Sequence, residues 1–335
     1  MNREISRLLV ALKAAHGVTG ISHTLVDKTW TYEMNLSKWL EVNFLLPGSA
    51  SFVCYNDEVP EEFEKKFGNS ASFAHSKGVL VWTDSQLYWL IHSVPKWPYI
   101  KVDSHEITDD VSSWWTFLCC CCCVSSCRKA KSQEIFNINI PEIPHGETKY
   151  GQSFILLQVS ICDNVLVDKI LEQLLFMNVQ LYQRKGISQE KIVSMKKVIS
   201  SLAKENLSIR VLEITKSIKH YAKSRYDHKD FYESIVELTA VNQCLVESWM
   251  RPAMEESNTV HHIQSLNWKD CNDHTFHIKE TSDHSKWAIS KGGKKKWVLV
   301  GDLNRMTSQQ KRGGGGLLLE NCNNLYKSFD LLQRA

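Results

Sequence analysis

Two segments of the chain alternate between short apolar runs and turn residues. In residues 78–94, two apolar runs flank the sequence Thr-Asp-Ser at 83–85. Residues 286–304 follow the same plan around the sequence Lys-Gly-Gly that begins at Lys291. Short apolar runs on either side of turn residues are typical of β-strands joined in a hairpin. The pattern therefore predicts two similar hairpins, far apart in the sequence.

Residues 164–249 carry their apolar residues at a different spacing. The apolar pairs 170–171 and 174–175 are four residues apart, as on one face of a helix. Segments 187–204 and 211–222 show a comparable spacing. The sequence thus predicts a helix-rich middle between two strand-rich regions, which is an α/β fold.

The tripeptide His-Ser-Lys precedes both predicted hairpins, at 75–77 and at 284–286. Each hairpin also ends near a polar residue, His92 in the first and Asn304 in the second. A repeated motif with a repeated hairpin is explained most simply by a chain built as two related halves. We place these halves at residues 1–165, with the first motif, and 166–335, with the helical region and the second motif.

The two motifs offer a chemistry of their own. Residues two apart in an extended segment point to the same side, so His75 shares a face with Lys77, and His284 with Lys286. Two imidazoles and two ammonium groups around one pocket suit the hydrolysis of a phosphodiester. A neutral imidazole attacks phosphorus, the protonated one gives its proton to the leaving oxygen, and the lysines balance the charge of the transition state.

The full candidate catalytic set also includes the polar residues after the hairpins, which can orient the other groups or bind phosphate oxygens. It consists of His75, Lys77, His92, His284, Lys286 and Asn304. This chemistry needs no metal and no cofactor. A histidine near the end of a strand is also common as a surface or packing residue, and that alternative stays open.

Charge is unevenly spread along the chain. The formal net charge is only +3, but the stretch from His284 to Gly316 holds eight basic residues and one acidic residue, Asp302. Such a concentration favours a polyanionic partner such as nucleic acid, although a solvated basic hairpin would have the same composition. The candidate substrate-binding residues are Lys294, Lys295, Lys296, Asp302, Arg305 and Arg312.

Cysteines and apolar runs exclude some classes of protein. Six of the eleven cysteines crowd into residues 119–127, and the others lack the Cys-x-x-Cys spacing of a zinc site. We interpret the apolar run at 114–127 as an inert insertion or an error in the coding sequence, with palmitoylation as a remote alternative. No run is long enough to span a bilayer. Lys13 interrupts the first apolar run, which makes residues 1–18 a poor signal peptide.

Several longer motifs occur in a characteristic order. They are Tyr55-Asn-Asp57, His75-Ser-Lys-Gly78, His92-Ser-Val-Pro95, Tyr150-Gly-Gln-Ser-Phe154, Ala222-Lys-Ser224, Asp230-Phe-Tyr232, Asp283-His-Ser-Lys-Trp287, Gly301-Asp-Leu-Asn-Arg305 and Arg312-Gly-Gly-Gly315. From about residue 50 to the end, this series resembles the deoxyribonuclease II family, a branch of the phospholipase-D-like superfamily.

The resemblance implies a fold, an activity and a location. The fold is a pseudo-dimer of α-β-α sandwiches with mixed sheets and one active site at the junction of the halves. The activity is endonucleolytic cleavage of DNA at acid pH without a metal, which leaves 3′-phosphate ends and passes through a phosphohistidine. His75 would be the nucleophile and His284 the general acid, with the reverse assignment left open. The enzyme would be lysosomal or secreted.

The chain also departs from the family. The first strand of the family is not recognisable in residues 1–50, and four family cysteines are replaced by Leu156, Ala288, Leu299 and Leu318. Each lost disulfide would cost about 2–5 kcal/mol, so we expect reduced stability. Two other functions stay open: a catalytically weak paralogue that binds DNA, and a phospholipase or phosphatidyl transferase with the same two-histidine chemistry. The sequence leaves the oligomeric state undetermined.

Overall fold

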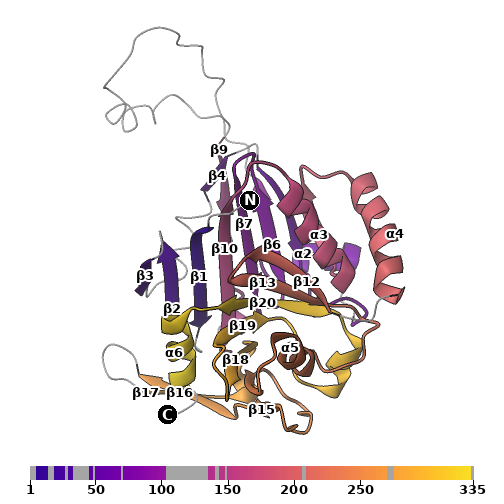
Figure 1. Cartoon of the computed structure of the whole chain (residues 1–335). Coiled ribbons are helices and arrows are strands. Elements are labelled where there is room, and N and C mark those ends of the chain that lie inside the picture. Colours follow the sequence, from indigo (N-terminus) through magenta and orange to yellow (C-terminus); the bar gives the residue numbers. More distant parts are fainter. Residues whose placement is uncertain are drawn as a thin grey trace, which may run out of the picture.

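Two β-sheets pack against each other through a shared apolar core (Figure 1). The computed structural model describes residues 5–13, 19–26, 29–32, 45–47, 50–68, 71–102, 135–139, 143–147, 149–205, 209–269 and 275–332. The cysteine run at 119–127 and Cys271 lie outside these residues. The predicted α/β class is confirmed, since five helices accompany the sheets in the described part of the chain.

The first sheet has eight strands, and its pairs are antiparallel. In spatial order these are β11 (Leu181–Lys185), β5 (Ser51–Tyr55), β6 (Gly78–Trp82), β7 (Gln86–His92), β10 (Gln152–Ser160), β1 (Ile5–Lys13), β2 (Thr19–Val26) and β3 (Thr29–Tyr32). Residues 1–50, in which the family's first strand was not recognisable, thus do contain strands, among them β1, β2 and β3. Their sequence differs from that of the family's first strand.

The second sheet has seven strands and is mixed, because β14 pairs with β15 in parallel. Its order is β12 (Arg210–Thr215), β13 (Ile218–Lys223), β20 (Gly314–Glu320), β19 (Trp297–Gly301), β18 (Trp287–Lys291), β14 (Gln243–Glu247) and β15 (Val260–His262). Smaller sheets pair β16 (Ser265–Lys269) with β17 (Thr275–Lys279), and β4 (Leu45–Pro47), β9 (Ile135–Asn139) and β8 (Lys101–Val102) with one another.

Both predicted hairpins are present, and each sits in the same local order of strands. The first sheet contains β5-β6-β7-β10 followed along the chain by helix α3 (Val165–Met177). The second contains β14-β18-β19-β20 followed by helix α6 (Asn323–Leu332). Because each His-Ser-Lys motif directly precedes the second strand of its set, the two motifs occupy equivalent places.

Helices fill the space between the sheets and cover their outer faces. The core between the sheets includes side chains of α3 and α6 and the buried Trp89 and Trp287. Helix α4 (Gln189–Glu205) packs beside α3, as Figure 1 shows at the right. The outer face of the first sheet is covered by α2 (Glu61–Phe67) and that of the second by α5 (Phe231–Thr239).

One helical prediction is wrong. Segment 211–222 forms the antiparallel strands β12 and β13, not a helix. Its apolar residues fit both periods over so short a length, and pairing of β13 with β20 along six residues decides for the strand. Within the range 164–249 predicted as helix-rich, the residues at 170–175 lie in α3 and segment 187–204 largely forms α4, but β11 and β14 also lie in this range.

The four positions at which family cysteines are replaced lie in the core. Leu156, Ala288, Leu299 and Leu318 are all buried, so these side chains fill the space with apolar contacts. The cysteines of the described residues, Cys54, Cys162, Cys244 and Cys322, are free thiols. None of the described helices is long and apolar enough to cross a membrane.

Candidate active site

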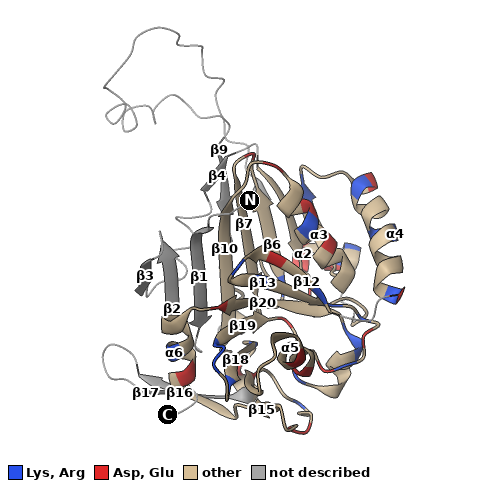
Figure 2. Cartoon of the chain, viewed as in Figure 1, with Lys and Arg blue, Asp and Glu red and all other residues tan. Residues whose placement is uncertain are grey.

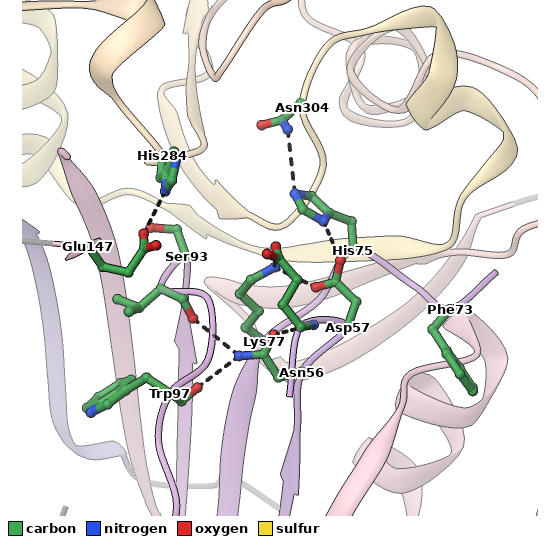
Figure 3. Close-up of polar contacts among 12 residues, drawn as sticks. Asn56, Asp57, Phe73, His75, Lys77, Ser93, Trp97, Glu147, His284 and Asn304 are labelled. Carbon is green, nitrogen blue, oxygen red and sulfur yellow. Dashed lines mark hydrogen bonds and ion pairs between the residues drawn. The ribbon is translucent and has the colours of Figure 1, made fainter. Parts of the chain in front are cut away.

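Both His-Ser-Lys motifs contribute to one pocket between the two sheets (Figure 3). The pocket has a volume of about 150 Å³. It is lined by Glu58, His75, Lys77, Ser93, Pro95, Trp249, His284, Lys286 and Asn304. The structure thus places together five of the six residues predicted as catalytic, from segments more than 200 positions apart.

The serines of the motifs point away from the pocket and fix the backbone. The Oγ of Ser76 donates to Asp302 at 2.7 Å, and the Oγ of Ser285 donates to Asp283 at 2.7 Å. Burial raises the pKa of Asp302 to about 7 and also raises that of Asp283. The predicted alternation of side chains therefore holds, although both motifs lie just before the strands and not within them.

Asp57 is the centre of the charge cluster around the first histidine. Its Oδ2 lies 2.8 Å from Nδ1 of His75 and 2.8 Å from Nη2 of Arg312, and its Oδ1 lies 2.5 Å from Nζ of Lys77. Burial alone would raise the pKa of this carboxyl, but Lys77, His75 and Arg312 together lower it well below its usual range. Asp57 is therefore an anion that can only accept hydrogen bonds.

This anion determines which nitrogen of His75 carries the proton. A carboxylate cannot donate, so Nδ1 of His75 donates to Asp57 and Nε2 keeps its lone pair. Nε2 lies 3.5 Å from the amide nitrogen of Asn304. Burial and the charge of Lys77 lower the pKa of His75 to about 3, against the opposing effect of Asp57. The ring is consequently neutral at all but strongly acid pH.

The second histidine has a different environment. Nδ1 of His284 lies 3.3 Å from Oε2 of Glu147. The ring stacks on Tyr150 with centroids 4.3 Å apart and an interplanar angle of 18°, and it contacts Trp249 at 4.7 Å. The backbone N–H of His284 donates to Gly151 at 2.8 Å. A Cβ at Gly151 would lie 2.3 Å from a carboxylate oxygen of Asp283, so the close approach requires glycine here.

Both lysines of the motifs, Lys77 and Lys286, also line the pocket. Nζ of Lys286 donates to the carbonyl of His284 at 2.6 Å. Burial, and then the charge of Lys77, lowers the pKa of Lys286 to about 8. Asn56 holds the adjacent loop by donating to the carbonyls of Val94 (3.3 Å) and Trp97 (2.9 Å).

His92 and two of the predicted substrate-binding residues lie behind the pocket. The His92 ring packs against Trp97 with centroids 4.7 Å apart, and its Nδ1 accepts from the backbone of Val94. Burial and Lys77 lower the pKa of His92 well below its usual range. Asp302 is buried against Ser76, as described above. Arg305 is also buried, and it binds Asp230 at 2.8 Å.

The remaining predicted substrate-binding residues divide into two groups. Arg312 lies beside Asp57 and His75, at the edge of the charge cluster. Residues 294–296 form the turn between β18 and β19, a basic stretch visible beside β18 in Figure 2. This turn is at the opposite end of the hairpin from His284, which a five-residue strand places about 17 Å away.

Comparison with known proteins identifies the family of this chain. The family model described as Deoxyribonuclease II matches residues 47–333. The chain belongs to the deoxyribonuclease II family. It is accordingly a hydrolase of the deoxyribonuclease class, with DNA as its substrate.

Individual relatives are distant in sequence but similar over most of their length. Deoxyribonuclease-2-beta of Rattus norvegicus is 26% identical over 296 residues, which cover 84% of this chain and 70% of the relative. Deoxyribonuclease-2-beta of Homo sapiens is 24% identical, covering 84% and 68%. Plancitoxin-1 of Acanthaster planci is 25% identical, covering 84% and 69%.

Sequence reasoning missed several residues of this deoxyribonuclease II site. Asp57 and Tyr150 belong to motifs that indicated the family, but no local pattern showed that they contact the two histidines. Glu147 and Trp249 lie in no recognised motif, and only the fold places them at the pocket. Within the described residues, no cluster of three or more His, Cys, Asp or Glu side chains could hold a metal ion.

Proposed function

We propose that this chain is an acid endodeoxyribonuclease that cleaves DNA phosphodiesters without a metal, through a phosphohistidine, and leaves 3′-phosphate ends. The observation that carries the proposal is the single pocket in which two histidines, each with a carboxylate at Nδ1, lie beside two lysines. These groups suffice for nucleophilic attack, proton transfer and charge stabilisation.

His75 is the nucleophile in this mechanism. Asp57 binds its Nδ1 proton and leaves the Nε2 lone pair available to attack phosphorus. Its pKa of about 3 keeps the ring neutral in mildly acid solution, where an ordinary histidine would be protonated. The N–P bond forms as the bond between phosphorus and the 5′-oxygen breaks.

His284 transfers the protons. Its Nε2 gives a proton to the departing 5′-oxygen, and the carboxylate of Glu147 balances the charge of the doubly protonated ring. In the second step, His284 takes a proton from water as the water oxygen attacks phosphorus. The N–P bond then breaks, and its electron pair returns to His75. The products are a 5′-hydroxyl and a 3′-phosphate.

Lys77, Lys286 and Asn304 stabilise the phosphate in both steps. They lie in the pocket where the non-bridging oxygens gain charge in the five-coordinate transition state. Lys286 keeps its proton below about pH 8, so this stabilisation is present in acid and is lost as the pH rises through that value. His92, Asp302 and Arg305 support the pocket from behind, while Arg312 holds Asp57 in place.

We also propose a specific fold type and a location for this protein. The matching strand orders support a phospholipase-D-like pseudo-dimer with its halves at residues 1–165 and 166–335, although β11 of the second half pairs with β5 of the first. Family membership supports a lysosomal or secreted location.

The test is cleavage of plasmid DNA at mildly acid pH in excess chelator. The proposal predicts nicking by the unaltered protein and almost none by His75→Ala or His284→Ala, with DNA binding retained within a few-fold. Binding by the unaltered protein without nicking would instead identify a DNA-binding paralogue.

A further inference from the structure

Trp249 is a pocket residue that the mechanism above does not use. It lines the pocket together with both motif histidines, yet it makes no part of the proton or charge transfers. Its ring lies 4.7 Å from the ring of His284, and it forms an edge contact with Tyr150 at 5.7 Å. The residue is partly exposed, so part of its surface is open to solvent.

We infer that Trp249 stacks on the base of the leaving nucleoside, which makes it a substrate-binding residue for the nucleotide on the 3′ side of the cleaved bond. The inference rests on the proposed function, because His284 is there the donor to the 5′-oxygen of that nucleoside. An aromatic ring directly beside the proton donor is therefore beside the leaving group. Bases of any sequence stack on aromatic side chains.

Arg251 marks the accessible side of the same ring. Its guanidinium lies over Trp249 at 5.7 Å from the centroid, and its side chain is exposed. An arriving base can replace this cation on the ring. The freed guanidinium is then close to the next phosphate of the strand, for which its planar fork of donors is suited.

The two sides of the pocket differ, which gives the inference a direction. The His75 side is made of charged and amide groups, namely Asp57, Arg312 and Asn304. In the described part of the chain, no aromatic ring contact to His75 is found, whereas His284 has a stacked contact with Tyr150 and a tilted one with Trp249. Base contact is therefore expected on the leaving side of the scissile phosphate and not on the side that becomes the phosphohistidine.

The experiment uses oligodeoxynucleotides with a single cleavable linkage. One has all its bases, one carries a stable abasic analogue on the leaving side, and one carries it on the retained side. For the unaltered protein, loss of the leaving-side base should lower kcat/KM by about tenfold, and loss of the retained-side base should change it little. Trp249→Ala should lower kcat/KM about tenfold on the intact strand, with no further loss on the leaving-side abasic strand.

The controls separate stacking from support of His284. Trp249→Phe should restore most of the base dependence. Tyr226→Ala removes another exposed ring with an arginine beside it, Arg225 at 5.8 Å, that is not among the residues lining the pocket, and should leave all three rates unchanged. Equal losses on all three strands in Trp249→Ala would overturn the inference, because the ring would then act only on His284.

A binding measurement distinguishes failure of the inference from failure of the proposed function. In a His75→Ala background, which cannot form the phosphohistidine, the intact strand should bind about tenfold more tightly than the leaving-side abasic strand. This difference should vanish when Trp249→Ala is added. No cleavage by the unaltered protein would refute the proposed function, while equal binding of the two strands would refute the stacking site.

Discussion

His220 is a buried histidine whose replacement should make the protein more resistant to acid. The side chain lies in β13 against Trp89 of the other sheet, with ring centroids 4.8 Å apart. Neither ring nitrogen has a hydrogen-bond partner among the described residues. Burial lowers the pKa of this imidazole to about 3.

The expected magnitude follows from linkage between protonation and folding. The folded pKa of His220 lies below the unfolded value of about 6.5, so between these values the unfolded chain binds the extra proton. Stability is therefore lost as the pH falls through this window and is unaffected above it. At pH 5, about 1.5 units below the unfolded value, the loss amounts to about 2 kcal/mol.

The perturbation is His220→Leu, and the assay is urea unfolding at pH 8 and pH 5. The value at pH 8 measures any change in packing, which is common to both conditions. Relative to the unaltered protein, the variant should gain about 2 kcal/mol of unfolding free energy between pH 8 and pH 5. Both proteins contain His75 and His92, so the contributions of these two residues to the pH dependence of stability cancel in the comparison. The same difference at both pH values would show that His220 is not a buried neutral imidazole, and would refute the reasoning.

Further predictions concern metal, charge and disulfides. Excess chelator should leave cleavage unchanged, and a loss restored by magnesium would contradict the two-histidine chemistry. Lys286→Ala should mainly lower kcat, and a rise in KM alone would contradict the role given to this lysine. Lys294→Ala should weaken binding of plasmid DNA and reduce its salt dependence while leaving cleavage of a dinucleotide unchanged, because the turn is about 17 Å from the pocket. Thermal melts with and without reductant should agree within error, whereas a large fall in Tm would reveal a disulfide.

Features encoded by short stretches of sequence could be predicted here. The two hairpins follow from apolar runs around turn residues, and the two motifs fall at equivalent positions because each directly precedes a strand. Alternation along an extended segment also placed His75 and Lys77 on one side and Ser76 on the other. These are local rules, and the surrounding fold does not overturn them.

Features that depend on distant contacts could not be predicted. Part of segment 211–222 becomes strand β13 because β20, almost 100 residues later, offers a partner. The basic residues 294–296 are near His284 in sequence, but the hairpin carries them one strand length away. Glu147 reaches His284 only through the approach of Gly151 to Asp283, which no spacing in the sequence signals.

The central claim is that His75 forms the covalent bond and His284 moves the proton. It is tested most directly by trapping the intermediate in His284→Ala with a p-nitrophenyl ester of a nucleoside 3′-phosphate, whose leaving group needs no proton. The account predicts a burst of p-nitrophenol and covalent phosphate on His75 alone, with no burst in His75→Ala. Phosphate on another residue, or a full burst in His75→Ala, would contradict it.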